Sequence, residues 1–427
     1  MLKVRYKIKT KNLIFFEIIY ILFIKFFIDV FNVPETAWYL CDIINVVVFL
    51  LAFKKIINTF SKIKANRFLV LIMLFLALTF LGHLINGGSI LLYLWGLRNI
   101  GRMFVFWINC IVILNKEDVE KIFKILYIAF ILNFIISIFQ FSILGIKGDN
   151  LGGIFGTKGS SNSFSLNLIV IVTTWTFIRY LDKDVSTIKL VLCMGIAVVL
   201  ATLTELKSYY ILMVILVILA LILQKKLNFR SIVILFFLFL GVMLAGTLLE
   251  KVFPDSVQYF TIEGMTEYLT GSGGVGYSST DDLSRTGAVS TIHEIFFEGD
   301  IIKEIFGFGL GNCEASSISI FNSSFYNRYE YLHYRWFFHA MTYIELGFTG
   351  ILWFIIFAIT MLIYVLKRAD KNNKIEYNVA CLTVIMIIYS LIIACYNSSL
   401  RIESGYLIYF ILASSFILFK YKLINDK

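Results

Sequence analysis

The stretch "FFHAMTYIELGFTG", Phe337 to Gly350, begins one of the longest apolar segments of this 427-residue chain. It places His339 at the start of the segment and Glu345 further inside it. The apolar residues continue to about residue 366, enough for a helix to cross a hydrocarbon core of roughly 30 Å. A carboxylate inside lipid is costly, so Glu345 predicts a buried ion pair, a protonated side chain or a functional role.

The composition of the whole chain agrees with a membrane setting. Hydrophobic residues make up 59% of the sequence and charged residues only 15%, so the chain would be insoluble as a globular protein. Because backbone groups in lipid must be satisfied within a helix, we predict an all-α, polytopic integral membrane protein with about twelve transmembrane helices. The predicted spans are 12–31, 37–53, 68–85, 90–114, 122–144, 163–180, 187–204, 208–224, 231–249, 340–366, 376–397 and 405–420.

The distribution of Lys and Arg predicts the orientation of these spans. Most of the 38 basic residues fall in the N-terminal segment, the C-terminal tail and every second connection between spans. By the positive-inside bias, both termini are expected in the cytoplasm. The net charge of +10 then follows from this asymmetry and from contact with anionic lipid, so no nucleic-acid partner is expected.

One connection is much longer than the others and is expected on the outer side of the membrane. It contains "GSGGVGYSSTDDLSR" (Gly271–Arg285), a predicted amphipathic helix from about Ala288 to Phe297, and "FGFGLGN" (Phe306–Asn312). A connection of this length usually carries function, although a mobile connector is the alternative. The chain divides into residues 1–249 with the first nine spans, 250–339 with the large extracytoplasmic loop, and 340–427 with the last three spans.

Cationic residues within or next to spans indicate an anion site. Arg98 and Arg102 lie four residues apart in the predicted fourth span, so both project from one helix face. Lys158, Lys207 and Arg335 lie near the outer starts of three other spans, whose N-termini carry partial positive charge. Together, and with Arg285 of the long connection as a further candidate, they predict an electropositive pocket for a lipid-linked phosphate or diphosphate. The alternative is snorkelling of these side chains to the interface.

The opening stretch resembles a known signature. "HAMTYIELGFTG" is similar to the His, then Glu-Leu-Gly-x-x-Gly pattern of the O-antigen ligase and polymerase superfamily, membrane enzymes of bacterial surface polysaccharide assembly. Four other stretches resemble segments of that family in the same order: "GIFGTKGSSNS", "LTELKS", "LSRTGAV" and "FGFGLGN". The resemblance covers about residues 90 to 360. Lys207 departs from it by standing where an arginine is usual, and no glycine separates Ser284 from Arg285.

The resemblance implies a glycosyltransferase of the GT-C type whose donor is a sugar chain on undecaprenyl diphosphate, with no metal and no cofactor. A base must accept the proton of the attacking hydroxyl, and cations must stabilise the leaving diphosphate. We expect His339 to be the base, with His293 or His333 as alternatives, and Arg285 and Glu345 to belong to the catalytic site. The expected diphosphate-binding residues are Arg98, Arg102, Lys207 and Arg335.

Two activities within the family remain open. A polymerase joins repeat units on the lipid carrier, whereas a ligase transfers a finished chain to a lipid A core. The sequence is rich in Ile, Phe, Lys and Asn and poor in Pro, which indicates an AT-rich genome of the kind common among Gram-positive bacteria. Because these bacteria lack an outer membrane, the composition favours a polymerase for capsular or other surface polysaccharide. A flippase or transporter is the alternative of another class, and it predicts internal repeats that the sequence lacks.

The predicted location is the bacterial cytoplasmic (inner) membrane. The expected partners are an undecaprenyl-diphosphate-linked oligosaccharide, the growing polysaccharide chain and membrane lipid, together with a flippase and a chain-length regulator.

Overall fold

The computed structural model describes residues 9–159, 161–227, 262–271 and 282–425, with a few single positions between 240 and 253. Over these residues the chain is helical and contains no β-strand. Six of the described helices are long and apolar enough to cross a membrane: α3 (Asn66–Asn86), α4 (Ile90–Ile113), α5 (Lys116–Ser142), α6 (Ser161–Leu181), α14 (Phe338–Arg368) and α15 (Lys374–Tyr396). The prediction of an all-helical membrane protein is confirmed at this level.

Helices also occupy five of the other predicted spans. These are α1 (Thr10–Phe31), α2 (Tyr39–Lys62), α7 (Thr187–Leu203), α8 (Lys207–Leu223) and α16 (Gly405–Asn425). Most of the remaining predicted span, 231–249, lies outside the described residues. That these segments cross the membrane stays a prediction.

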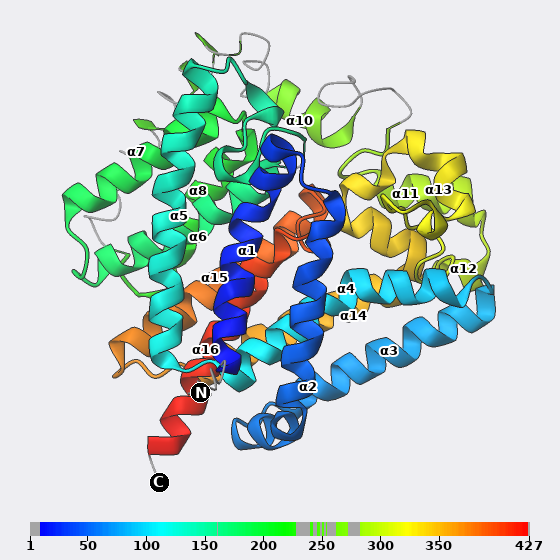
Figure 1. Cartoon of the computed structure of the whole chain (residues 1–427), viewed down its shortest axis with the longest axis horizontal. Coiled ribbons are helices and arrows are strands. Elements are labelled where there is room, and N and C mark those ends of the chain that lie inside the picture. Colours follow the sequence, from blue (N-terminus) through cyan, green and yellow to red (C-terminus); the bar gives the residue numbers. More distant parts are fainter. Residues whose placement is uncertain are drawn as a thin grey trace, which may run out of the picture.

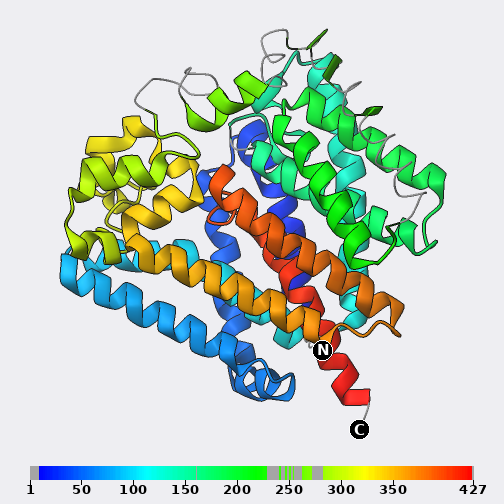
Figure 2. The same cartoon turned by 180° about the vertical axis from the view of Figure 1, so that it is seen from behind.

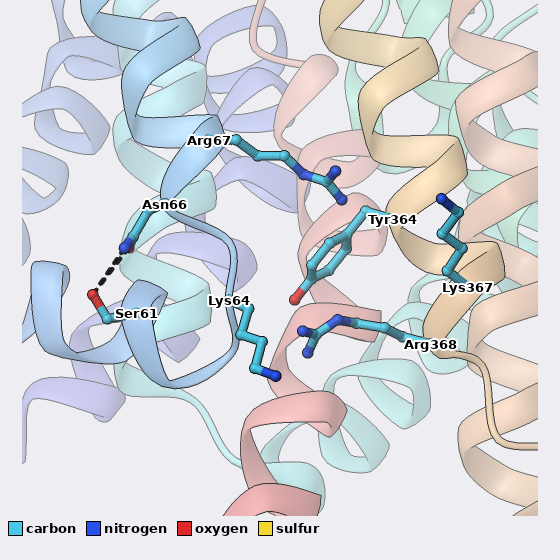
Figure 3. A pocket seen from close by; sticks show the side chains of 7 residues that line it. All are labelled: Ser61, Lys64, Asn66, Arg67, Tyr364, Lys367 and Arg368. Atoms are coloured by element: carbon cyan, nitrogen blue, oxygen red, sulfur yellow. Dashed lines mark hydrogen bonds between the residues drawn. The ribbon is translucent and has the colours of Figure 1, made fainter.

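The turn between α2 and α3 is tied to the end of α14. The hydroxyl of Tyr364 donates a hydrogen bond to the carbonyl of Ile63 at 2.7 Å, and Ser61 and Asn66 are hydrogen-bonded across the turn (Figure 3). Nearer the middle of α14, the indole of Trp353 donates to a backbone carbonyl of α3 at 2.8 Å. The two helices are therefore held together at separate points along their length.

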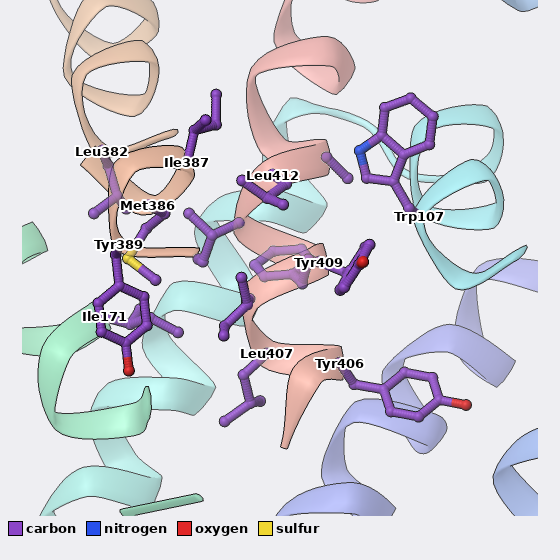
Figure 4. Close-up of a cluster of buried hydrophobic side chains, with 14 of the residues drawn as sticks. Trp107, Ile171, Leu382, Met386, Ile387, Tyr389, Tyr406, Leu407, Tyr409 and Leu412 are labelled. Carbon is purple, nitrogen blue, oxygen red and sulfur yellow. The ribbon is translucent and has the colours of Figure 1, made fainter. Parts of the chain in front are cut away.

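The last helix, α16, forms the centre of the bundle. Every residue from 406 to 419 is buried, and a helix that is buried on all faces is typical of a protein interior. Both views of the chain show α16 crossing the middle of the molecule (Figures 1 and 2). Figure 4 shows Tyr409 and Leu412 of α16 in the buried cluster that also contains Met386 of α15 and Trp107 of α4.

The described part of the long connection folds onto the start of α14. The helix α11 (Ala288–Ile292) continues as a π-helical turn, His293–Phe297. Ile292 and Phe297 are buried there in a second hydrophobic cluster that includes Tyr343 of α14. The predicted amphipathic helix is therefore confirmed.

The other helices of this connection are α10 (Ile262–Thr270), α12 (Ile301–Phe306) and α13 (Ser324–Tyr329). Most of "GSGGVGYSSTDDLSR" lies outside the described residues.

The helix α14 is kinked at Gly347, and the glycine-rich segment after α12 docks at the kink. Gly347 has φ 58° and ψ −153°, which interrupts the hydrogen bonding of the helix. The N–H of Phe308 donates to the carbonyl of Ile344 at 2.8 Å, and the N–H of Gly309 donates to the carbonyl of Glu345 at 2.9 Å. A Cβ on Gly347 would lie 2.4 Å from a carbonyl oxygen of α12. Gly347 therefore permits close packing, but against the long connection rather than against another span.

We predict that Gly347→Ala destabilises the protein by about 2–4 kcal/mol, because the new Cβ meets backbone and the positive φ disfavours alanine. The measurement is the melting temperature of the purified protein in detergent. Gly195→Ala in α7 is the matched control, since a Cβ there meets nothing within 4 Å, and it should leave stability unchanged or slightly higher. Equal losses in the two variants would contradict the packing role of Gly347.

Candidate functional site

A polar cavity of about 230 Å³ lies where α2 and α4 meet the long connection and the loop between α15 and α16. The 3-10 turn Glu35–Trp38, which precedes α2, forms one part of its wall. Both views show the α15–α16 loop beside the first turns of α2 (Figures 1 and 2). We call this cavity the arginine pocket. Its charged lining residues are Glu35, Arg98, Arg102, Glu314, Arg335, Arg401 and Glu403.

Arg98 projects from α4 toward the first turn of α2. Its Nε donates to Asp42 Oδ2 at 2.9 Å. Its guanidinium carbon lies 5.1 Å from the ring centre of Tyr39 and 4.9 Å from that of Trp95. An ion pair and two cation–π contacts thus fix its orientation at the pocket wall.

Arg102 lies one turn further along α4 and is only 7% exposed. Its Nη1 donates to Glu403 Oε1 at 2.5 Å, and its Nη2 donates to the backbone carbonyl of Arg401 at 3.0 Å. The predicted pair, Arg98 and Arg102, therefore shares one pocket, as the four-residue spacing indicates. Snorkelling does not describe Arg102, because the side chain is bonded inside the protein.

Arg401 occupies the interior of the site between two carboxylates. Its Nη2 donates to both Glu314 and Glu345, and all three side chains are buried. Glu345 also accepts a hydrogen bond from the N–H of Gly311 at 2.9 Å. Of the alternatives for Glu345, a buried ion pair is the one observed. The sequence suggests Arg98 or Arg102 of the predicted fourth span as its partner, and this is wrong, because the partner is Arg401.

Sequence reasoning missed Arg401, Glu403 and Glu314. The first two lie in "NSSLRIESG", which reads as a short polar connection between two predicted spans, and Glu314 follows the glycine-rich segment. One feature of the sequence indicates their role: Arg401 and Glu403 lie in a connection so short that both must stay close to the membrane.

Neighbouring cations keep the loop carboxylates ionised. Burial alone would raise the pKa of Glu314, but the charges of Arg401 and Arg335 and hydrogen bonds from Asn99 and Arg401 hold it below its usual value. Burial would also raise the pKa of Glu403, yet the guanidinium of Arg102 holds that pKa below its usual value. Both are therefore charged partners of arginine at neutral pH.

The network leaves several donors for a ligand. Arg335 donates to the carbonyl of Ala315 at 3.3 Å. Its charge acts on Glu314, but no close ion pair of Arg335 with a carboxylate is seen among the described residues. Trp95 Nε1, Arg102 Nε and Arg401 Nη1 are buried N–H groups for which no described residue is an acceptor. Buried donors normally have partners, so the pocket can accept a ligand that is rich in oxygen acceptors.

An apolar groove of about 670 Å³ begins at the same two arginines of α4. Helices α2, α3 and α4 line it, and Arg98 and Arg102 belong to its wall as well as to that of the arginine pocket. Helices α3 and α4 meet at the hairpin between them and diverge from there (Figures 1 and 2). The groove opens at the protein surface, because its lining residues Leu94 and Ile57 are 53% and 73% exposed.

Lys207 and Lys158 do not line the arginine pocket. Lys207 begins α8 and pairs with Glu205 at 2.9 Å. Lys158 is exposed, and its backbone N–H donates to Asp29 at 3.1 Å. The expectation that both share a cavity with Arg98 is therefore wrong. Helix α8 packs against α6 and α15, whereas α4 packs against α2 and α16, so parallel N-termini do not bring these cations together.

His339 and Arg285 lie outside the lining of the pocket as well. The Nδ1 of His339 is 3.2 Å from the carbonyl oxygen of Ala394. The guanidinium of Arg285 lies 3.9 Å from the ring centre of Tyr268 and 5.1 Å from that of Tyr396. Their catalytic roles stay predictions that the geometry of this pocket does not support.

The alternative histidines have partners in the long connection. His333 Nδ1 lies 2.6 Å from Asp282, and His293 Nδ1 lies 3.3 Å from Glu304. Neither lines the arginine pocket.

Comparisons of the chain with protein-family models and with curated proteins find no match. The functional argument therefore depends on the geometry of the site.

We predict that Arg401→Met destabilises the protein by about 3–5 kcal/mol, because it leaves Glu314 and Glu345 buried without their cation. Adding Glu314→Gln and Glu345→Gln should restore most of the loss. The melting temperature in detergent reports both effects.

Arg335→Met is the matched control for this prediction. Arg335 lines the same pocket but has no described ion pair, so its removal should cost much less stability. The account of Arg401 is wrong if the triple variant is no more stable than Arg401→Met alone.

Proposed function

We propose that the chain is a membrane-embedded glycosyltransferase whose donor is a sugar chain on undecaprenyl diphosphate. More specifically, we propose a polymerase that joins oligosaccharide repeat units at the outer face of the bacterial cytoplasmic membrane. In this proposal the chain has about twelve spans, cytoplasmic termini and an extracytoplasmic connection before α14. The resemblance of "HAMTYIELGFTG" to the O-antigen ligase and polymerase signature supports the assignment.

The observation that carries the proposal is that two cavities of opposite character share two residues of their walls. Arg98 and Arg102 form part of the wall of both the arginine pocket and the apolar groove. A polyprenyl diphosphate likewise joins an anionic head to a long apolar tail. The arginine pocket suits the diphosphate, and the groove suits the first isoprenoid units of the tail.

The chemistry requires charge stabilisation at the leaving group. An acceptor hydroxyl attacks the anomeric carbon of the donor sugar, the bond from that carbon to the diphosphate oxygen breaks, and the electron pair leaves with the diphosphate. Arginine N–H groups stabilise this developing charge without a metal. Arg335 is suited to this role because it lines the pocket and forms no close ion pair with any carboxylate of the described residues.

The proton of the acceptor hydroxyl must pass to a base. Glu35 is exposed, lines the arginine pocket and has no ion pair among the residues the structure describes. A carboxylate in that position can accept the proton as the new glycosidic bond forms. We therefore assign the role of base to Glu35, and His339 is the alternative that the family resemblance implies.

Deleting the gene in its host should reduce surface polysaccharide to single repeat units attached to the lipid carrier, as measured by gel analysis of extracted glycolipids. Long chains that persist on the carrier would indicate a ligase. Repeat units that remain on the cytoplasmic face would indicate a transporter. Either result would contradict the polymerase.

In the complemented deletion strain, we predict that Arg335→Ala lowers the rate of chain extension about 100-fold at unchanged protein level. Lys207→Ala is the control, because Lys207 lies outside the arginine pocket, and it should support nearly normal extension. The opposite ranking of the two variants would place the diphosphate away from the pocket.

The groove predicts a dependence on the length of the lipid tail. Gly101 lines the groove, and a Cβ there meets only one atom within 4 Å, at 3.9 Å, so Gly101→Phe should fill the groove without disrupting the fold. With purified protein, the KM for an undecaprenyl donor should rise at least tenfold, while the KM for a donor that carries a methyl group in place of the isoprenoid tail should change little, because that donor does not enter the groove. Gly195→Phe in α7 should affect neither donor. Equal effects of Gly101→Phe on both donors would exclude the groove as the tail site.

A further inference from the structure

A second basic cavity lies at the end of α14 that is remote from the arginine pocket. It has a volume of about 430 Å³ and is formed by the turn between α2 and α3 together with the last turn of α14. Figure 3 shows Lys64 and Arg67 from the first of these elements and Lys367 and Arg368 from the second. The site does not depend on the function proposed above, because it shares no residue with the arginine pocket.

The cations of this cavity lack the carboxylates that accompany the arginines of the first site. The remaining lining residues, Ser61, Asn66 and Tyr364, are neutral, and no ion pair to the four cations is found in the part of the chain that the structure describes. The guanidinium carbons of Arg67 and Arg368 lie 5.1 Å and 4.8 Å from the ring centre of Tyr364. Four like charges around one cavity repel each other, so a bound anion would stabilise the arrangement.

The architecture around Tyr364 builds this cavity rather than leaving four independent surface charges. Tyr364 is buried, and its hydroxyl donates to the carbonyl of Ile63 at 2.7 Å, which fixes the α2–α3 turn against α14. Its ring then holds Arg67 and Arg368 by cation–π contacts. Arg368 also belongs to the last turn of α14, where the helix dipole favours a cation.

The surface next to the cavity is apolar, which indicates the source of the anion. Leu366 and Ile363 of α14 are 47% and 40% exposed, and Val70 of α3 is 65% exposed. These residues lie within two turns of the cations on the same two helices, both of which are long and apolar enough to cross a membrane. An anion with acyl chains can use both surfaces, whereas free phosphate uses only the charges.

We propose that this cavity binds the phosphate of an anionic phospholipid headgroup, with the acyl chains on the exposed apolar faces of α3 and α14. The lipid comes from the leaflet opposite the arginine pocket. It bridges the α2–α3 turn and the end of α14 and so stabilises the packing of α3, which forms one wall of the apolar groove, against α14.

The test uses the purified full-length protein in a non-ionic detergent and titrates lipid by native mass spectrometry. Phosphatidylglycerol should bind and phosphatidylcholine should not. Lys64→Gln with Lys367→Gln should weaken phosphatidylglycerol binding about 10- to 30-fold, because each lysine near a lipid surface contributes roughly 1 kcal/mol. Both lysines are exposed, so the double variant should fold normally.

The matched control is Lys121→Gln with Lys124→Gln, which removes the same charge from two exposed lysines of α5. It should leave phosphatidylglycerol binding close to that of the wild type. An equal loss in the control variant overturns the proposal, because binding would then follow net charge. The proposal is also overturned if inorganic phosphate displaces phosphatidylglycerol with an affinity equal to that of the lipid. The site would then be one for a free anion.

Discussion

The buried cation of Arg401, held between Glu314 and Glu345, is the interaction on which the architecture of the site depends. Burying charged side chains costs several kcal/mol each unless they face partners of opposite charge, so the segments that carry these three residues must meet in one arrangement. Those segments are the long connection, α14 and the loop between α15 and α16. The ion pair of Arg102 with Glu403 adds α4 to the same network. Lipid tails are as apolar as the side chains of the helices, so the hydrophobic effect contributes little to helix association in a membrane. Polar contacts such as these therefore help to determine how the helices pack.

Close backbone approach makes this network possible. A Cβ on Gly311 would lie 1.9 Å from the carbonyl oxygen of Leu92 in α4, and the residue has φ +88°, so only glycine fits there. Its N–H then reaches the carboxylate of Glu345. The glycines of "FGFGLGN" therefore act through geometry, by bringing the long connection against α4 and the kink of α14. The arginine pocket forms where these elements meet, and the apolar groove between α2, α3 and α4 shares Arg98 and Arg102 with it.

The sequence predicted local features well and long-range pairing poorly. Apolar length identified the six helices that are suited to a membrane, the amphipathic pattern identified Ala288–Phe297, and the spacing of Arg98 and Arg102 placed both at one pocket. The partners of these arginines could not be predicted in the same way. Arg102 pairs with Glu403 from a distant part of the chain, and that pairing depends on α16 packing against α4. Helix direction alone groups Lys207 with these arginines, but direction predicts only the side of the membrane and not which helices are neighbours.

Photo-crosslinking with undecaprenyl diphosphate that carries a diazirine on its first isoprene units tests the central claim most directly. If the diphosphate occupies the arginine pocket and the tail follows the groove, mass spectrometry should map the crosslinks to groove residues such as Phe49 of α2 and Val105 of α4. Excess unlabelled undecaprenyl diphosphate should suppress them. Crosslinks that concentrate on α6, α7 and α8, or that spread over the lipid-facing surface without competition, would contradict the account.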